Sequence, residues 1–132
     1  MGVKFTSTFD AARTQRQVEY AIEKALSDAL EEAVRVIQFF IATRGTPKSG
    51  KSGRVVTGKM LDSVFSEMDE SGGTFHGGVG WKDHELYFSL QEDGFRHLGG
   101  DMVPAMNAFM DAYPVFREDL IRRLSEELAR VL

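Results

Sequence analysis

The sequence predicts an α+β fold in which helices cover one face of a small antiparallel sheet. Apolar residues follow helical spacing through residues 14–43 and again near the end of the chain, and two short segments of strand character flank a glycine pair between them. The chain has 132 residues and 42% hydrophobic content, which is the size of one domain. We therefore predict a single domain over residues 1–132, in the order long helix, short helix, hairpin, short helix, long helix.

The first long helix is predicted over residues 14–43, after an arm of residues 1–13 that we expect to be mobile. No Pro or Gly interrupts it, and its apolar residues are Val18, Ile22, Ala25, Leu26, Ala29, Leu30, Ala33, Val34, Ile37, Phe40 and Ile41. Such a helix is roughly 40 Å long, whereas a small domain is about 30 Å across. Two interpretations stay open. Part of the helix projects and packs on another subunit, or its ends fray and the rest packs internally.

Residues 44–56 predict a flexible basic loop, because three glycines and one proline end the helix. No acidic residue lies between positions 44 and 59, and the basic residues there are Arg44, Lys48, Lys51, Arg54 and Lys59. The net charge of the whole chain is −4, so the remaining 11 basic and 20 acidic residues give the rest a charge of −9. A basic loop on an acidic body faces phosphate, faces the acidic surface of a neighbouring subunit, or is simply solvated.

The middle of the chain predicts a short helix followed by a hairpin. Thr57 is a suitable N-cap for a helix through about Ser63. Strands are predicted over residues 64–68 and 74–81, with a turn at residues 69–73. One face of the second strand would carry Phe75, Gly77, Val79 and Trp81. The hairpin should rest on the helices through this face.

The last third of the chain predicts two more helices. Residues 84–92 form a short helix, and residues 93–103 are irregular or a third strand. Pro104 suits the first turn of the last helix, and Pro114 should kink or restart that helix. The amphipathic face of the terminal helix consists of Phe116, Leu120, Ile121, Leu124, Leu128 and Val131.

One string matches a nucleotide-binding motif. Gly45–Ser52 fits the phosphate-loop pattern G-x-x-x-x-G-K-[ST]. The mechanism needs a buried strand before the loop and a helix that starts at the Lys-Ser pair, so that amides at the helix N-terminus hold phosphate. Here a long helix comes first, and Gly53–Val56 is a poor helix start. We therefore interpret the string as a basic linker and keep nucleotide binding as the alternative.

The other patterns for chemistry are weak. The chain has no cysteine, so disulfides and thiolate metal sites are excluded. His76, His84 and His97 lack metal-ligand spacing. Glu92 and Asp93 are adjacent, and sequence neighbours do not point at a common substrate. We predict no catalytic residue, no metal and no cofactor.

Two further patterns favour structure over binding. Gly78–Gly80 lacks the third glycine of a dinucleotide loop and predicts a bulge or a close backbone approach within a strand. Four aromatic residues could stack on nucleic-acid bases, namely Trp81, Tyr87, Phe88 and Phe95. Their spacing fits packing in the core better. The acidic balance also argues against sequence-specific DNA recognition.

Two short signatures on either side of the hairpin carry a resemblance. Residues 57–63 resemble T-G-x-L-x-x-S, with Met60 at the leucine position and Leu61 directly after it, and residues 87–95 contain Y-x-x-x-x-E-x-G. Together with Pro-Ala-Met at residues 104–106, they resemble the head–tail connector or tail-completion proteins of the neck of long-tailed phages and prophages. The likeness covers about residues 14–128. Two departures leave the layer of the neck open: Phe95 stands where the family often has Thr, and Met-Val at 102–103 where it often has Pro-Phe.

The resemblance implies a non-enzymatic virion protein, made in the host cytoplasm, that forms a hexameric ring between the head connector or stopper and the tail tube or tail terminator. Tail terminator and minor tail protein are the alternatives within the same class. The residues expected to serve structure and assembly are Thr57, Gly58, Leu61, Ser63, Tyr87, Glu92, Gly94, Phe95 and Pro104. The residues expected to contact a neighbouring subunit or the passing DNA are Arg44, Lys48, Lys51 and Arg54.

Two hypotheses from other classes remain beside it. The first is a small nucleotide-binding protein that uses Gly45–Ser52. The second is a regulatory or toxin-type module that binds a protein partner through the long helix, and neighbouring genes would separate it from a virion part.

Overall fold

The computed structural model describes residues 11–44, 59–82, 85–96, 102–103 and 105–132, and the predicted α+β class is confirmed. The elements in chain order are α1 (Ala11–Thr43), α2 (Lys59–Ser63), β1 (Val64–Ser71), β2 (Thr74–Trp81), α3 (Glu85–Asp93), β3 (Phe95–Arg96), β4 (Met102–Val103) and α4 (Ala108–Val131). None of the helices in the described part has the length and apolar character that a membrane span requires.

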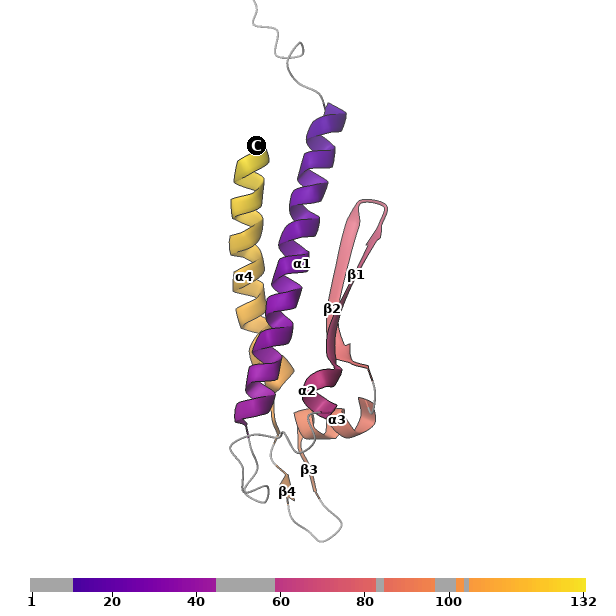
Figure 1. Cartoon of the computed structure of the whole chain (residues 1–132), viewed down its shortest axis with the longest axis vertical. Coiled ribbons are helices and arrows are strands. Elements are labelled where there is room, and N and C mark those ends of the chain that lie inside the picture. The colour runs from indigo at the N-terminus through magenta and orange to yellow at the C-terminus, as the bar shows by residue number, and fades with distance from the viewer. Residues whose placement is uncertain (1–10, 45–58, 83–84, 97–101, 104) are drawn as a thin grey trace, which may run out of the picture.

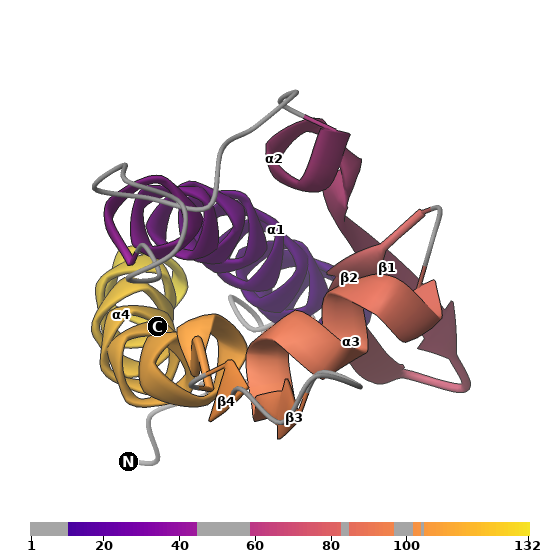
Figure 2. The same ribbon diagram turned by 90° about the horizontal axis from the view of Figure 1, so that it is seen from below.

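Helix α1 is the axis of the molecule. Helix α4 runs beside it, the β1–β2 hairpin lies along a different side, and α2 and α3 gather near its C-terminal end (Figures 1 and 2). Helix α1 presents a strip of buried alanines at every fourth position: Ala21, Ala25, Ala29 and Ala33. Because alanine adds little bulk, neighbouring elements can approach the helix axis closely.

The hairpin is regular and longer than predicted. Strands β1 and β2 pair antiparallel from Val64 opposite Trp81 to Ser71 opposite Thr74. The turn is therefore only Gly72 and Gly73, with φ of 59° and 83°. A two-residue turn with positive φ at both positions needs residues such as glycine, and it matches the twist of the strands.

The predicted face of β2 is the one that meets the helices. A Cβ atom added at Gly77 would lie 2.7 Å from Cδ1 of Leu30 in α1, so glycine permits the close approach of strand and helix there. Val79 and Trp81 pack against the core. The predicted bulge at Gly78–Gly80 is wrong, because these residues keep the register of the two strands. At Gly78 there is no close approach either, since a Cβ atom added there would meet nothing within 4 Å.

The hydrophobic core lies where α1 ends and α4 begins. Its buried members are Ile37, Ile41, Met60, Val64, Phe88, Met106, Ala108 and Ala112. Trp81 packs against Phe88 and Phe109, with ring centroids 5.7 Å and 4.5 Å away. Core packing, rather than base stacking, is thus what Trp81 and Phe88 do here.

The start of the last helix differs from the prediction. Helix α4 begins at Ala108, and residues 105–107 are not helical. Pro104, which lies outside the described residues, is therefore not in its first turn. The reason is Asn107, whose left-handed φ of 53° breaks the helical path just before Ala108. Pro114 lies inside one continuous helix, so the predicted restart does not occur. Before α4, β3 and β4 form a short antiparallel pair.

Candidate functional site

The described candidate residues cluster at the end of the molecule where α1 finishes and α4 starts. They are Arg44, Leu61, Ser63, Glu92 and Gly94. Outside the described residues lie Lys48, Lys51, Arg54, Thr57, Gly58 and Pro104. For Tyr87 in α3 and Phe95 in β3 only the backbone is described.

The first signature joins α2 to its two neighbours. The buried hydroxyl of Ser63 donates to the carbonyl of Met60 (2.9 Å), and the carbonyl of Ser63 accepts from the N–H of Lys82 (3.0 Å). The side-chain amide of Gln38 in α1 donates to the carbonyl of Leu61 (3.1 Å). Helix α2 is thereby tied both to α1 and to the end of the hairpin. Sequence reasoning missed Gln38, although a polar residue within the apolar run was its signal.

Gly94 in the second signature ends α3. Its φ is 81°, and its N–H donates to the carbonyl of Leu90 (2.8 Å). A left-handed residue that closes the last turn in this way is a common helix C-terminus, and glycine takes this conformation without steric cost. Gly94 therefore provides the left-handed backbone conformation that ends α3.

Glu92 caps another helix. Its two carboxylate oxygens accept the N–H of Phe109 in the first turn of α4, at 2.9 and 3.2 Å. The backbone carbonyls of Gln91 and Glu92 accept from Met106 and Asn107, at 3.0 and 3.2 Å. Asn107 makes no side-chain cap bond of its own. The carboxylate from α3 therefore fills the position that a local N-cap residue usually fills.

Two opposing effects act on the pKa of Glu92. Burial raises the pKa of Glu92, because the charged carboxylate loses more hydration energy on burial than the neutral carboxyl group does. The N–H groups of Phe109 and Met110 and the charge of Arg44 lower it, and the balance leaves the pKa above the ordinary value of 4.5.

Arg44 holds the other side of the same junction. Its Nη1 donates to the carbonyls of Met106 (2.8 Å) and Asn107 (3.0 Å) and to Oδ2 of Asp111 (2.6 Å). Its guanidinium also lies 4.0 Å from the ring centroid of Phe40. This arginine was grouped with the basic loop, and here it is engaged within its own chain. Arg44, Glu92, Met106, Asn107 and Asp111 are called the junction below.

Away from the junction, the apolar face of α4 is only partly covered. On the predicted face from Phe116 to Val131, Ile121 is 54% exposed and the other members are half-buried. Earlier in α4, Met110 is 70% and Tyr113 is 64% exposed. The buried residues of α4 are Ala108 and Ala112. A helix whose apolar face is so incompletely buried has surface left for another chain.

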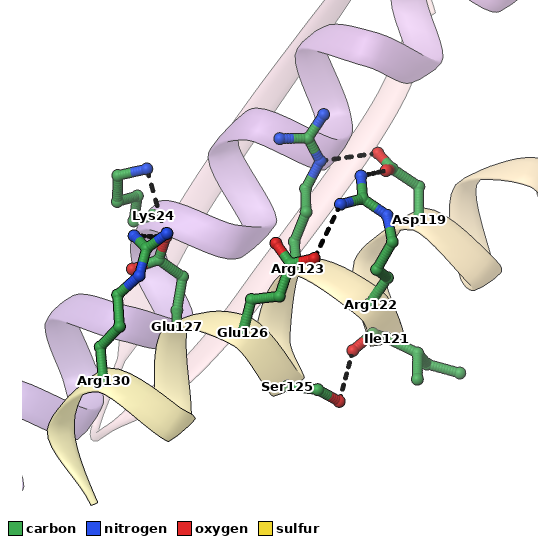
Figure 3. A network of polar contacts seen from close by, with 9 residues as sticks. All are labelled: Lys24, Asp119, Ile121, Arg122, Arg123, Ser125, Glu126, Glu127 and Arg130. Atoms are coloured by element: carbon green, nitrogen blue, oxygen red, sulfur yellow. Dashed lines mark hydrogen bonds and ion pairs between the residues drawn. The ribbon is translucent and has the colours of Figure 1, made fainter.

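The side of α4 next to α1 carries an ion-pair network (Figure 3). Asp119 accepts from Arg122 (2.7 Å) and Arg123 (2.8 Å), Arg122 also pairs with Glu126, and Glu127 pairs with Arg130 and, from α1, Lys24. Burial alone would raise the pKa of Asp119, but the hydrogen bonds from Arg123 and Arg122 outweigh it and lower this pKa. Of these pairs, Lys24–Glu127 joins α1 to α4 at 3.4 Å, and the others lie within α4. They lie mostly at the surface, so each pair stabilises the fold only slightly.

The described residues around the phosphate-loop string do not have the order that nucleotide binding needs. The element before Gly45–Ser52 is the helix α1, and the next described element is the helix α2. The string itself lies outside the described residues. Within the described part, no group of three or more His, Cys, Asp or Glu side chains is placed to hold a metal ion. His76 is exposed on β2, and His84 and His97 are not described.

No protein-family model, no curated protein and no solved structure matches this chain.

Proposed function

We propose that this chain is a structural, non-enzymatic component of the neck of a tailed phage or prophage, where it forms a ring that joins the head connector to the tail tube. The family is proposed from the order and spacing of the two signatures, at residues 57–63 and 87–95. Tail terminator and minor tail protein are the alternatives within this class.

The observation that carries the proposal is what the described signature residues do. Ser63 and Leu61 tie α2 to α1 and to the hairpin, and Gly94 and Glu92 end α3 and cap α4. These residues build a frame and use their polar groups within the chain. Side chains that hold a frame together suit a protein that acts by being assembled, because assembly needs a fixed shape and free surfaces.

The free surfaces support the same proposal. The exposed apolar side chains of α1 and α4 include Tyr20, Phe39, Met110, Tyr113 and Ile121. The first ten residues of α1, positions 11–20, contain no buried side chain, and this end extends beyond the C-terminal end of α4 (Figure 1). Such a projecting segment fits the interpretation in which α1 reaches another subunit.

Microscopy combined with mass measurement tests the proposal. We expect negatively stained rings, hexameric by the resemblance, either from the chain alone or when the head connector or tail tube is added. Absence of the chain from purified virions, with intact phage produced after deletion of its gene, would contradict the proposal.

The basic loop gives a second test. Changing Lys48, Lys51 and Arg54 together to Ser should impair neck assembly and infectivity, because the loop is proposed to contact a neighbouring subunit or the passing DNA. Full infectivity of the triple variant would remove the loop from the proposal.

Calorimetry separates the neck protein from a nucleotide-binding protein. We expect no heat of binding from ATP or GTP with Mg²⁺. Micromolar binding that Lys51→Ala abolishes would favour the nucleotide-binding alternative instead.

A further inference from the structure

One face of α4 carries a stripe of exposed side chains. Met110, Tyr113, Arg117 and Ile121 follow one another at intervals of three, four and four residues, so at 100° per residue they share one side of the helix. The three apolar members are 70%, 64% and 54% exposed, and Arg117 is exposed between them. We call these four residues the α4 stripe.

Arg117 differs from the other arginines of α4. Arg122, Arg123 and Arg130 pair with acidic residues of the same helix. For Arg117, no ion pair occurs within the described part of the chain. Among the described residues Arg117 thus offers a positive charge between exposed apolar side chains, and an acidic surface on another chain would complement this charge.

The hairpin tip has the complementary character. Residues 64–81 contain no Lys or Arg, and their acidic side chains are the exposed Glu67, Asp69 and Glu70. Among the described residues none of the three forms an ion pair. Successive strand residues point to opposite faces, so Glu67 and Asp69 share one face of β1 with the half-buried Phe65, whereas Met68 and Glu70 lie on the face of Gly77 and Phe75 that is turned to α1. The hairpin tip, defined as residues 67–75, thus carries an acidic pair on the face turned away from α1.

The two surfaces do not meet within one chain. The hairpin and α4 lie on different sides of α1, which stands between them (Figures 1 and 2). Their lengths nevertheless agree. The stripe from Met110 to Ile121 is about 16 Å long at 1.5 Å per residue, and the strand from Glu67 to Ser71 is about 13 Å long at 3.3 Å per residue.

We propose that the α4 stripe of one subunit binds the hairpin tip of a second copy of this chain, with Arg117 facing Glu67 and Asp69. This contact joins two different surfaces, so it can repeat from subunit to subunit and close into a ring. The inference rests on the proposed function, because it names the contact between subunits of the proposed ring.

Cysteine crosslinking tests the contact directly, since the chain has no cysteine. Tyr113→Cys and Asp69→Cys variants are prepared separately, then mixed at high concentration with a short bismaleimide. We expect covalent dimers only in the mixture, and a ladder of higher species from the double variant. Dimers of Tyr113→Cys alone would overturn the proposal in favour of α4 packing on α4. No crosslink in any sample would overturn it too, and would leave the stripe to a different protein.

Charge reversal supplies a second measurement. Arg117→Glu should weaken self-association in sedimentation about tenfold, and adding Glu67→Lys with Asp69→Lys should restore it. Glu67→Lys with Asp69→Lys alone should weaken self-association as well, so each half of the exchange controls the other. Failure of the combined variant to regain the association of the wild type would overturn the contact.

The two proposals fail in different ways. Rings seen by microscopy without the crosslink would contradict this contact and leave the neck function standing. The crosslinked ladder from a chain that is absent from virions would support the contact and contradict the neck function.

Discussion

At the scale of single residues, Glu92 replaces the local cap that α4 lacks, and Arg44 holds the backbone just before the helix. Asn107 has left-handed φ and makes no side-chain cap bond, so the first amides of α4 need an acceptor from elsewhere. Glu92 accepts the N–H of Phe109, and Arg44 binds the carbonyls of Met106 and Asn107. The start of α4 is thereby fixed by residues from α1 and α3.

Substitution of Glu92 should separate its capping role from its charge. Glu92→Ala leaves a half-buried N–H without its acceptor and should lower the free energy of unfolding by about 1–3 kcal/mol. Glu92→Gln keeps a carbonyl acceptor and removes a desolvated charge, so it should stay within about 1 kcal/mol of the wild type at pH 7. Urea denaturation measures both. The exposed neighbour Asp93→Ala is the control, and equal midpoints for Glu92→Ala and Asp93→Ala would refute the cap.

The pH dependence follows from the raised pKa of Glu92. In the folded state this carboxyl binds its proton more tightly than in the unfolded chain, so between the two pKa values the unfolded state holds fewer protons. Its contribution to stability is therefore complete below about the ordinary value of 4.5 and is lost as the pH rises through the folded pKa. The free energy of unfolding of the wild type minus that of Glu92→Gln should therefore decrease as the pH rises from about 4.5 through the folded pKa of Glu92. A difference that rises with pH would contradict the burial argument.

At the scale of the elements, the alanine strip of α1 sets the distance to its neighbours. Ala29 is 0% exposed and lies at the middle of the strip. Larger side chains there would force the packed elements apart, and well-packed interiors resist such changes.

Ala29→Leu should lower the free energy of unfolding by about 1–3 kcal/mol, because the added atoms overpack the interior. The same change at Ala12, which is exposed near the start of α1, should alter it by less than about 0.5 kcal/mol. Thermal unfolding followed by circular dichroism compares the two. Similar melting temperatures for both variants would show that the strip tolerates bulk.

The elements themselves were largely predictable from sequence, because each has a local cause. The apolar spacing of residues 14–43 predicts α1, and Gly72-Gly73 predicts the hairpin turn. The turn was predicted over residues 69–73, because Asp69, Glu70 and Ser71 are residue types that favour turns. The hairpin is longer, because a turn of two glycines lets the strand pairing continue to Ser71.

The junction was not predictable in the same way. Pro104 is a good local signal for a helix start, but α4 begins at Ala108 because Asn107 and the distant Glu92 and Arg44 decide the path. These contacts join residues far apart in the sequence, and no local pattern announces them. The two signatures indicate that Glu92 and Gly94 are structural residues. Their hydrogen-bond partners, Phe109 and Leu90, are known only from the structure.

At the scale of the whole molecule, the distribution of buried residues divides the chain. The largest buried side chains lie near the junction, the alanine strip continues the buried face of α1 as far as Ala21, and positions 11–20 contain no buried side chain. The first turns of α1 therefore contribute little to the core and offer surface. This division is what a subunit of a larger assembly requires, because binding surfaces can then change without loss of the core.

Removal of residues 1–17 tests that division. Positions 11–20 of α1 contain no buried side chain, so the truncated chain should lose less than about 1 kcal/mol in its free energy of unfolding. If the projecting turns contact a neighbouring subunit, the same truncation should sharply reduce ring formation, which mass photometry measures beside urea denaturation. Val18→Ala in the full-length chain, which trims one half-buried side chain, is the control for local packing. A large loss of stability on truncation would mean that these turns pack on their own domain, whereas unchanged stability with unchanged rings would place the subunit contacts on α4 and the hairpin instead.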